Sequence, residues 1–426
     1  MKYLFIVTES ASANGICTKA IMDVLAKNNE VFCITNREWG SETSYVKDGI
    51  AYYTVKPRLV YRISSMIAKR NMPQLLKKAL QLIKRVMDRA KLLVSLPTWP
   101  LISPAYSKRI EKEARRLCGE FGIACIVPVY TQIDTLIAAD RIKKDHDEIM
   151  YIPYFLDSLS GGYGLRVFSE MQTRVRALRW ERRLLQSADW IIAMESSRKH
   201  HEKYSFSESY YGKMKFLDLP LLRTELPDAA EPLFDEKCCN LVYVGTLPHG
   251  IRSPKYILNV FKMLEGQQYQ LWFIGTNDNV TLNEAVSEDT RIHIVGRCSH
   301  EIAMQYELQA DVLINIGNTN PNMTPSKIFE YMSFAKPIVS TKASDEEPSV
   351  RYLGKYPQTL ILDEERTDFA SAAEELKSFI ERSSTQGIDC GRIHEVFFRN
   401  TPQAFADFLE EQTGAEKNEG SADQFI

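Results

Sequence analysis

The chain has 426 residues, of which 44% are hydrophobic and 25% are charged, and its formal net charge is −2. This length exceeds one typical core and predicts two or three domains, and the composition excludes a long disordered protein. A net charge this close to zero gives the whole molecule no general attraction for nucleic acid.

The first half of the chain alternates between predicted strands and predicted helices. The strands are expected at 2–7, 30–35, 123–130, 149–155 and 190–194, and the helices at 16–28, 131–144 and 174–189. This alternation is typical of a parallel α/β sheet. We therefore expect residues 1–220 to form one Rossmann-like domain.

Residues 221–237 are rich in proline and acidic residues and lack periodicity, so they are expected to be a linker. The strand–helix alternation then restarts and predicts a second doubly wound domain over 238–385. Residues 386–414 are expected to form terminal helices, which could cross back to the first domain. Residues 415–426 are expected to form a frayed tail. The predicted fold class is α/β, with two Rossmann-like doubly wound domains that face a cleft.

The N-terminal apolar run stops at Thr8 and is shorter than the apolar region of a signal peptide. The sequence contains no run of 18 apolar residues, so no membrane-spanning helix is expected. The eight cysteines form no Cys-x-x-Cys pair, which favours buried thiols in a reducing compartment. These features predict a cytoplasmic protein.

The segment 324–340 combines a short helix pattern with a lysine and a glutamate three residues apart. Thr324 suits the N-cap and Pro325 the first helical position, which places Lys327 in the first turn. A lysine there opposes the helix dipole, and a bound phosphate would compensate for it. Glu330 lies on the same face, one turn deeper, where a carboxylate suits a ribose diol. The alternative is a surface Lys–Glu pair on an amphipathic helix.

The sequence TPSKIFEYMSFAKPIVST resembles the donor-site motif of GT-B fold glycosyltransferases, in particular the retaining type of family four. Three earlier segments resemble the blocks that precede this motif: LVYVGTLPHGIRSPKYILNVFKML, LWFIGTNDN and RIHIVGRCSHEIAMQYELQADVLINIGN. The first half resembles the family more weakly, through ANG at 13–15 and WERRLLQSADWIIAMESSRKH. The resemblance implies a retaining enzyme that moves a sugar from a nucleotide-diphosphate sugar to a polysaccharide or lipid-linked acceptor in cell-surface glycan biosynthesis.

The resemblance also implies roles for individual residues. Glu330 would bind the ribose, and Lys327 with Arg252, or Lys255 in its place, would hold the diphosphate. Arg297 would lie near the base, and Gly15 would approach the donor from the first domain. The whole implied donor-binding set is Gly15, Gly245, Thr246, Arg252, Arg297, Asn322, Thr324, Pro325, Ser326, Lys327 and Glu330.

The sequence departs from the family pattern at three places. Asn322 stands where the family often has an earlier glutamate, and Thr246 stands where it usually has an arginine. No histidine ends the strand 123–130, so Asp157 becomes the candidate catalytic residue on the acceptor side. The alternative for Asp157 is a turn aspartate.

Two further expectations concern histidines and metals. His249 either touches the donor or is an ordinary turn residue, and His200 and His201 are expected to face solvent. Cations and helix N-termini can stabilise a diphosphate leaving group without metal, so neither a metal nor another cofactor is expected.

Residues 56–116 form a basic arm, with 16 Lys or Arg residues against three acidic ones. Within it, residues 73–93 predict a basic amphipathic helix, with Leu76, Leu80, Ile83, Met87 and Ala90 on one stripe. Such a helix can lie on an anionic membrane, and the alternative is a core-packing helix with a solvated basic face. Nucleic acid is not an expected partner, because no recognition motif accompanies the charge.

The expected protein is thus a glycosyltransferase, peripheral at the inner face of the membrane. Three alternatives stay open. They are a nucleotide-sugar epimerase of the same fold, a non-catalytic sugar-nucleotide-binding subunit, and a membrane-surface scaffold of a glycan assembly system.

Overall fold

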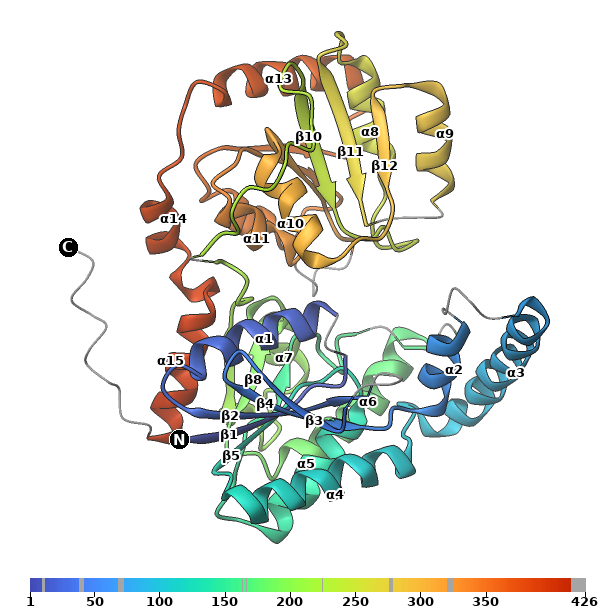
Figure 1. Ribbon diagram of the computed structural model, residues 1–426, viewed down its shortest axis with the longest axis vertical. Helices are drawn as coiled ribbons and strands as arrows, with labels where there is room; N and C mark the ends of the chain where they lie inside the picture. Colours follow the sequence, from blue (N-terminus) through green and yellow to red (C-terminus); the bar gives the residue numbers. More distant parts are fainter. Residues whose placement is uncertain are drawn as a thin grey trace. The chain divides into compact units, whose positions relative to one another are not determined.

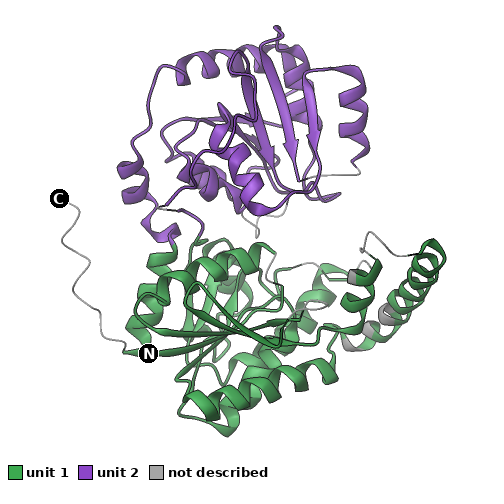
Figure 2. Ribbon diagram, viewed as in Figure 1, with its two compact units in different colours: residues 1–220, 402–426 green, residues 221–401 purple. Residues whose placement is uncertain are grey.

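The computed structural model describes residues 1–9, 12–37, 42–67, 73–162, 164–165, 167–223, 225–275, 279–319 and 325–414. It divides into two compact units (Figure 2). Unit 1 comprises residues 1–220 together with 402–426, and unit 2 comprises residues 221–401. The chain therefore returns to unit 1 at Pro402.

Unit 1 contains a six-stranded sheet in the order β3-β4-β2-β1-β5-β6 and a three-stranded parallel sheet in the order β7-β8-β9 (Figure 1). Its strands are β1 (Lys2–Ile6), β2 (Glu30–Asn36), β3 (Ser44–Lys47), β4 (Ile50–Val55), β5 (Cys125–Pro128), β6 (Met150–Tyr151), β7 (Tyr154–Phe155), β8 (Ile191–Met194) and β9 (Met214–Leu217). Its helices are α1 (Ala13–Leu25), α2 (Leu59–Ile67), α3 (Gln74–Thr98), α4 (Pro104–Phe121), α5 (Ile133–Asp145), α6 (Glu170–Leu185), α7 (Arg198–Tyr204) and α15 (Pro402–Thr413).

The edge of the larger sheet is an antiparallel hairpin that the periodicity analysis did not predict. β3 pairs antiparallel with β4, and Asp48 and Gly49 connect them with φ values of 52° and 76°. An Asp-Gly pair favours the positive φ values that a tight hairpin turn requires. The other strand pairs of this sheet are parallel.

Unit 2 is a parallel sheet in the order β12-β11-β10-β13-β14-β15. Its strands are β10 (Cys239–Val244), β11 (Tyr269–Ile274), β12 (Ile292–Val295), β13 (Val312–Ile316), β14 (Ile338–Lys342) and β15 (Thr359–Asp363). Its helices are α8 (Lys255–Met263), α9 (Val280–Glu288), α10 (His300–Gln309), α11 (Lys327–Ser333), α12 (Val350–Leu353), α13 (Phe369–Ser383) and α14 (Cys390–Val396). The strand order reverses between β10 and β13, and ligands of open α/β sheets bind outside the carboxyl ends of the strands at such a switch point.

The segment 221–237, expected to be a linker, belongs to unit 2. The backbone N–H groups of Ala230 and Leu233 donate to the side chains of Gln305 and Gln309 on α10. The side-chain amides of both glutamines donate back to carbonyls of the segment. These bonds attach the segment along one helix, although its composition alone gave no periodic signal.

The core of unit 2 is a hydrophobic cluster that joins the sheet to α8, α9 and α13. Phe273 of β11 is completely buried in it and contacts the ring of Tyr243. We expect Phe273→Ala to lower the free energy of unfolding by about 3–5 kcal/mol, because it leaves a cavity in a close-packed core. Chemical denaturation would measure this, with Phe398→Ala as control, since the Phe398 side chain is 48% exposed. Equal stability losses in the two variants would contradict the assigned core.

Candidate functional site

The carboxyl ends of β10 and β13 are shaped by two glycines. Gly245 follows β10 with a φ of 149°, and a Cβ atom there would lie 3.2 Å from the Tyr243 hydroxyl. Gly317 follows β13, and a Cβ atom there would lie 2.7 Å from the Thr341 carbonyl oxygen. Position 245 therefore requires glycine for its positive φ, and position 317 requires it for the close approach of the Thr341 backbone.

The loops after these two strands are bound to each other. The Thr319 N–H donates to the Ile251 carbonyl at 3.1 Å, and Arg252 Nε donates to Asn318 Oδ1 at 2.7 Å. The guanidinium of Arg252 is half-buried and is held at the carboxyl edge of the sheet. The structure thus places this predicted diphosphate-binding residue beside the switch point.

Lys327 and Glu330 of α11 form an ion pair, as their three-residue spacing predicts. Lys327 Nζ donates to Glu330 Oε2 at 2.7 Å and to Glu307 Oε1 of α10 at 2.8 Å. The side chains of Glu307 and Glu330 are 0% and 3% exposed, and that of Lys327 is 24% exposed. The third ammonium hydrogen of Lys327 has no acceptor among the residues that the structure describes, so it remains available to a ligand.

Arg223 and His300 complete the cluster beside Glu330. Arg223 Nη2 donates to His300 Nε2 at 2.9 Å, and His300 Nε2 lies 3.3 Å from Glu330 Oε1. Burial lowers the pKa of His300, so its ring is neutral and Nε2 accepts the bond from Arg223. Glu330 Oε1 and Glu307 Oε2 are buried oxygens with no hydrogen-bond partner in the described structure, and Arg223 Nη2 lies 4.0 Å from Glu330 Oε1 as an ion pair. A buried acceptor without a donor is costly, which makes Glu330 Oε1 a candidate contact for a ligand hydroxyl.

The protonation states of this cluster follow from burial and from the ion pairs. Burial raises the pKa of Glu307 to about 8, against the opposing effect of Lys327. Burial also acts to raise the pKa of Glu330, but Lys327 and His300 together bring it below its usual value. Burial acts to lower the pKa of Lys327, and the two carboxylates outweigh it and raise that pKa. At neutral pH the cluster therefore holds two cations, Arg223 and Lys327, and one anion, Glu330, and its net positive charge suits an anionic ligand.

Two details of the predicted helix start are wrong. The N-cap of α11 is Ser326, which has helical backbone angles and gives no side-chain cap bond, so Pro325 precedes the helix. The charge of Lys327 is balanced by Glu330, and Glu307 accepts a hydrogen bond from it, so its position does not by itself require a bound phosphate. Asn322 and Thr324 lie outside the described residues.

Four further residues that were expected near the donor are exposed. Thr246 follows Gly245 and is exposed, and its carbonyl oxygen accepts a bond of 2.9 Å from the Tyr243 hydroxyl. Arg297 is exposed in the loop after β12, and Lys255 and His249 are also exposed. Each of these residues comes after the carboxyl end of β10 or β12. None of them belongs to the buried cluster around Glu330.

In unit 1, Gly15 lies in the first turn of α1 rather than in the preceding loop where we expected it. Its N–H donates to the side chain of Ser12, the N-cap of α1, at 3.2 Å. Nearby, the hydroxyls of Thr8 and Thr131 are 2.6 Å apart and join the chain after β1 to the chain after β5. These strands flank the switch point of this sheet.

Asp157 follows β7 and is exposed, and the loop after it is anchored by the two histidines expected to face solvent. His201 is 3% exposed, and its Nε2 lies 3.2 Å from Ser158 Oγ. His200 Nε2 lies 2.9 Å from Ser160 Oγ. The expectation for His200 and His201 is therefore wrong, because serines from a segment 40 residues earlier supply their polar partners.

Sequence reasoning missed three members of the buried cluster, Arg223, His300 and Glu307. A signal for two of them exists in α10, because His300, Ala303 and Glu307 stand at positions i, i+3 and i+7 and share one face. A histidine and a glutamate on the face that a helix buries indicate a polar site. Arg223 had no comparable signal, because it lies in an aperiodic segment.

The chain contains an Asp-x-Asp pattern, Asp145 and Asp147, that the expectation of a metal-free reaction overlooked. Both lie just before β6, at the amino end of that strand and opposite the carboxyl edge where ligands of parallel sheets bind. Asp145 accepts a bond of 2.5 Å from Arg115, and the Asp147 side chain is fully exposed. This pattern therefore does not belong to either switch point.

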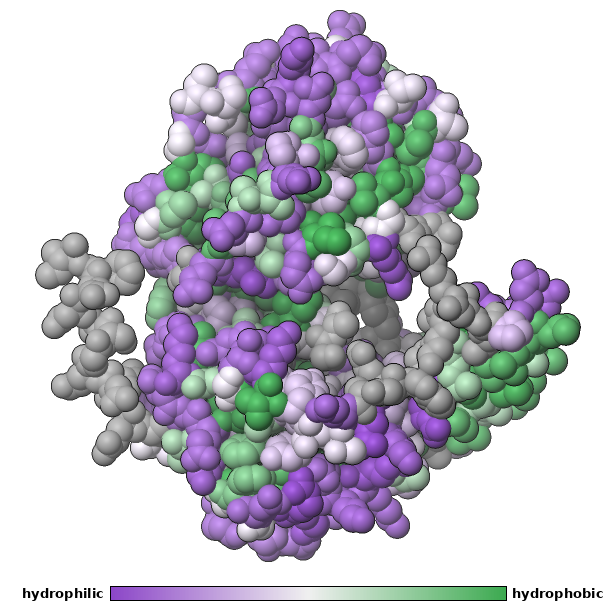
Figure 3. Space-filling view, in the orientation of Figure 1, coloured by the Kyte–Doolittle hydropathy of each residue, from purple (hydrophilic) through white to green (hydrophobic). Residues whose placement is uncertain are grey.

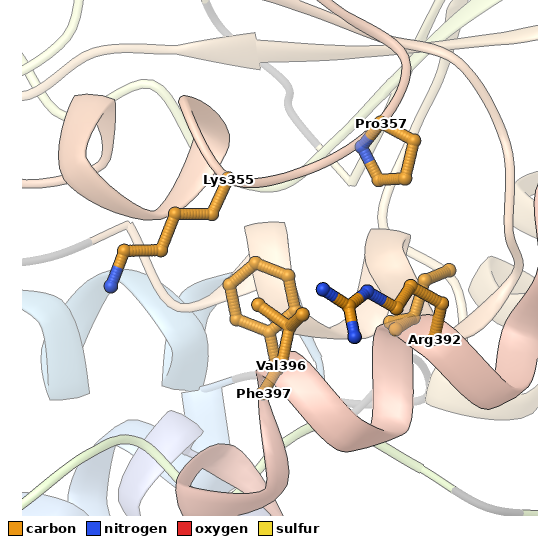
Figure 4. Close-up of a pocket in the computed structure, with 6 residues that line it drawn as sticks. Lys355, Pro357, Arg392, Val396 and Phe397 are labelled. Carbon is orange, nitrogen blue, oxygen red and sulfur yellow. The ribbon is translucent and has the colours of Figure 1, made fainter.

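A cavity of about 310 Å³ lies elsewhere in unit 2 (Figure 4). Its lining residues are Lys355, Pro357, Arg392, Ile393, Val396 and Phe397. Lys355 and Pro357 precede β15 and so stand at the amino end of that strand, and Arg392 forms an ion pair with Glu395. The cavity contains no predicted site residue and is separate from the cluster around Glu330.

Comparison with known proteins identifies a family match in unit 2. Residues 238–378 match the family model described as glycosyl transferases group 1. This match spans β10 to α13 and includes Arg252, Glu307, Lys327 and Glu330. A search among curated proteins finds no match.

Solved structures match nearly the full length of the chain at low sequence identity. Sucrose-phosphate synthase from Thermosynechococcus elongatus matches with a TM-score of 0.65 and 13% identity over 97% of this chain and 98% of that one. Anabaena HepE in complex with UDP matches with a TM-score of 0.60 and 12% identity over 98% and 100%. The lipopolysaccharide outer core galactosyltransferase WaaB matches with a TM-score of 0.52 and 13% identity over 96% and 100%.

Identities this low establish the fold, and they confirm the predicted α/β class with two Rossmann-like domains. The family model covers the strands and helices that carry the cluster around Glu330. The chain has the GT-B fold, and its residues 238–378 form a glycosyl transferases group 1 domain.

Proposed function

We propose that this protein transfers a sugar from a nucleotide-diphosphate sugar to a polysaccharide or lipid-linked acceptor in cell-surface glycan biosynthesis. The observation that carries the proposal is the buried Glu330 carboxylate with an unbonded Oε1, beside Lys327, in a glycosyl transferases group 1 domain. The fold alone hosts several functions, so the proposal depends on this site and not on the architecture.

The proposed donor site lies at the carboxyl edge of the unit 2 sheet. A ribose hydroxyl donates to Glu330 Oε1, which satisfies the buried acceptor. The diphosphate oxygens accept bonds from the third hydrogen of Lys327 and from Arg252. The exposed loop that carries Arg297 contacts the base, and the loop at Gly245 and Thr246 passes close to the phosphates.

In the reaction, the bond between the anomeric carbon and the diphosphate oxygen breaks, and a bond to an acceptor hydroxyl oxygen forms. Negative charge gathers on the leaving nucleoside diphosphate. Fixed cations in a site shielded from water stabilise such charge strongly, and Lys327 and Arg252 fill that role. We propose that the anomeric configuration is retained, that no metal is required and that Asp157 serves the acceptor side.

We also propose that the protein works in the cytoplasm as a peripheral protein at the inner face of the membrane, where lipid-linked acceptors are found. Among the described residues, the structure contains no helix that is both long enough and apolar enough to cross a bilayer. The element that would hold the protein at the surface is argued in the next subsection.

A transfer assay tests this function directly. Wild-type protein is incubated with UDP-, GDP- and ADP-sugars, each with and without a cell extract that contains polysaccharide and lipid acceptors, and the products are analysed by mass spectrometry. We expect a glycosylated product that requires the extract and one of the donors. An isomerised donor without extract would establish an epimerase, and nucleotide binding with no product from any extract would establish a non-catalytic subunit.

A further inference from the structure

The helix α3 of unit 1 exposes a long apolar face that the proposed reaction does not use. It has 25 residues, which gives a length of about 37 Å. No residue between Gln74 and Ala90 is buried. A helix with this many apolar residues normally buries them, so the exposed face requires a partner.

The exposed residues form one continuous stripe. Leu75, Leu82, Val86 and Leu93 are 85%, 62%, 60% and 67% exposed, and their spacing of 7, 4 and 7 residues keeps them on one side of the helix. Leu76 and Ile83, both 48% exposed, widen the stripe on one flank. Figure 3 shows a hydrophobic surface where α3 lies in Figure 1.

The rest of unit 1 contacts α3 on the side away from the stripe and near the end of the helix. The half-buried residues of its first four turns include Leu80 and Met87, and α3 packs against α2. Near its end, Arg176 of α6 donates to the carbonyl oxygens of Leu96 and Pro97. The helix is thus fixed to unit 1 through one side and one end, while the stripe is left on the outside.

Basic residues follow the edge of the stripe. Lys78, Arg85 and Arg89 each stand three positions after a stripe residue, Leu75, Leu82 and Val86 respectively, so each is its neighbour on the helix surface. These three and Lys77 form no ion pair with any residue that the structure describes. Elsewhere in the basic arm the charges are used internally, since Arg58 pairs with Asp134 and Arg115 with Glu111.

We propose that α3 is a membrane-binding helix that lies in the interface of an anionic bilayer, with the stripe in the acyl region and Lys78, Arg85 and Arg89 on lipid phosphates. An exposed apolar face with a basic border is the pattern of helices that lie in this interface. A second copy of the chain fits less well, because pairing two stripes would bring two basic borders together. The proposal rests on the proposed function only for the choice of membrane face, which is the inner face where lipid-linked acceptors occur.

Vesicle co-sedimentation of the full chain tests the proposal. The vesicles contain phosphatidylcholine with or without phosphatidylglycerol. We expect wild type to bind the anionic vesicles, to bind the neutral ones at least tenfold more weakly, and to release with added salt. Leu82→Glu with Val86→Glu should lower binding to anionic vesicles at least tenfold. The control changes two exposed residues of unit 2 in the same way, Met263→Glu with Val280→Glu, and should bind like wild type.

Three measurements on the same samples separate the outcomes. Circular dichroism verifies that each variant is folded, and light scattering measures its oligomeric state. Calorimetry with the preferred nucleotide shows whether the donor site is intact. The proposal that α3 binds membranes is overturned if wild type does not bind vesicles or if the stripe variant binds as well as wild type. It is also overturned if wild type is a dimer that the stripe variant disrupts. Vesicle binding without binding of any nucleotide leaves the membrane helix standing and overturns the proposed function instead.

Discussion

Glu330→Gln is expected to weaken binding of the preferred nucleoside diphosphate about 10- to 150-fold, because hydrogen bonds to a charged group contribute about 1.5–3 kcal/mol. The substitution keeps the shape of the side chain and removes the charge that Oε1 offers to a ribose hydroxyl. Lys327→Met should weaken binding at least as much, since it removes the diphosphate contact. It should also destabilise unit 2, because it leaves the Glu330 carboxylate buried without its cation and removes the hydrogen bond to Glu307.

Calorimetric titration of each variant measures the effect on affinity, and unfolding curves measure the effect on stability. The matched controls are Lys262→Met and Glu288→Gln, which break an ion pair of the same kind in the same unit, with side chains 33% and 62% exposed. Exposed pairs contribute little, so the controls should change neither affinity nor stability by more than about 1 kcal/mol. Wild-type affinity in Glu330→Gln would remove Glu330 from the donor site.

Glu307→Gln is expected to flatten the dependence of stability on pH between about 4.5 and 8. The folded protein holds the proton of Glu307 up to about pH 8, whereas the unfolded chain releases it near the usual value of 4.5. Folding therefore binds a proton in this window, and the free energy of unfolding falls as the pH rises. One such group contributes a slope of about 1.4 kcal/mol per pH unit. Glutamine cannot release a proton, so the variant loses this contribution.

Urea denaturation of wild type and Glu307→Gln at several pH values measures the difference. Burial also raises the pKa of Glu181 in unit 1 to about 7, which adds a similar slope to both proteins. Subtraction of the two curves therefore isolates Glu307, and the exposed Glu288→Gln variant should retain the wild-type slope. An unchanged slope in Glu307→Gln would mean that Glu307 is ionised in the folded protein at neutral pH.

The sequence predicted local features of the site better than its tertiary partners. A spacing of three residues was enough to place Lys327 and Glu330 on one face of α11, and glycines after strands marked the turns at the switch point. The contact between Glu307 and Lys327 could not be predicted, because Glu307 reaches Lys327 from another helix, 20 residues earlier. A bound phosphate is not needed to explain the lysine at the helix start, because Glu307 and Glu330 are its partners inside the protein.

The basic arm shows the same limit. Periodicity identified the amphipathic helix but not which part of its apolar face would be covered. The stripe expected from Leu76, Leu80, Ile83, Met87 and Ala90 is split in the structure. Leu80 and Met87 are half-buried, whereas Leu76, Ile83 and Ala90 are exposed. Tertiary packing decides which apolar residues of a helix are covered, and the sequence pattern of that helix alone does not contain this information.

The central claim is that unit 2 binds a nucleotide-diphosphate sugar, and calorimetric titration of wild type with UDP, GDP, ADP and their sugars tests it most directly. The account predicts saturable binding with one preferred base. At 100 times its dissociation constant, the preferred ligand should also stabilise the fold by about 2.7 kcal/mol in a thermal melt. If no nucleotide or nucleotide sugar in the panel gives a binding signal, the cluster around Glu330 is a structural ion-pair network and the proposed donor site is contradicted.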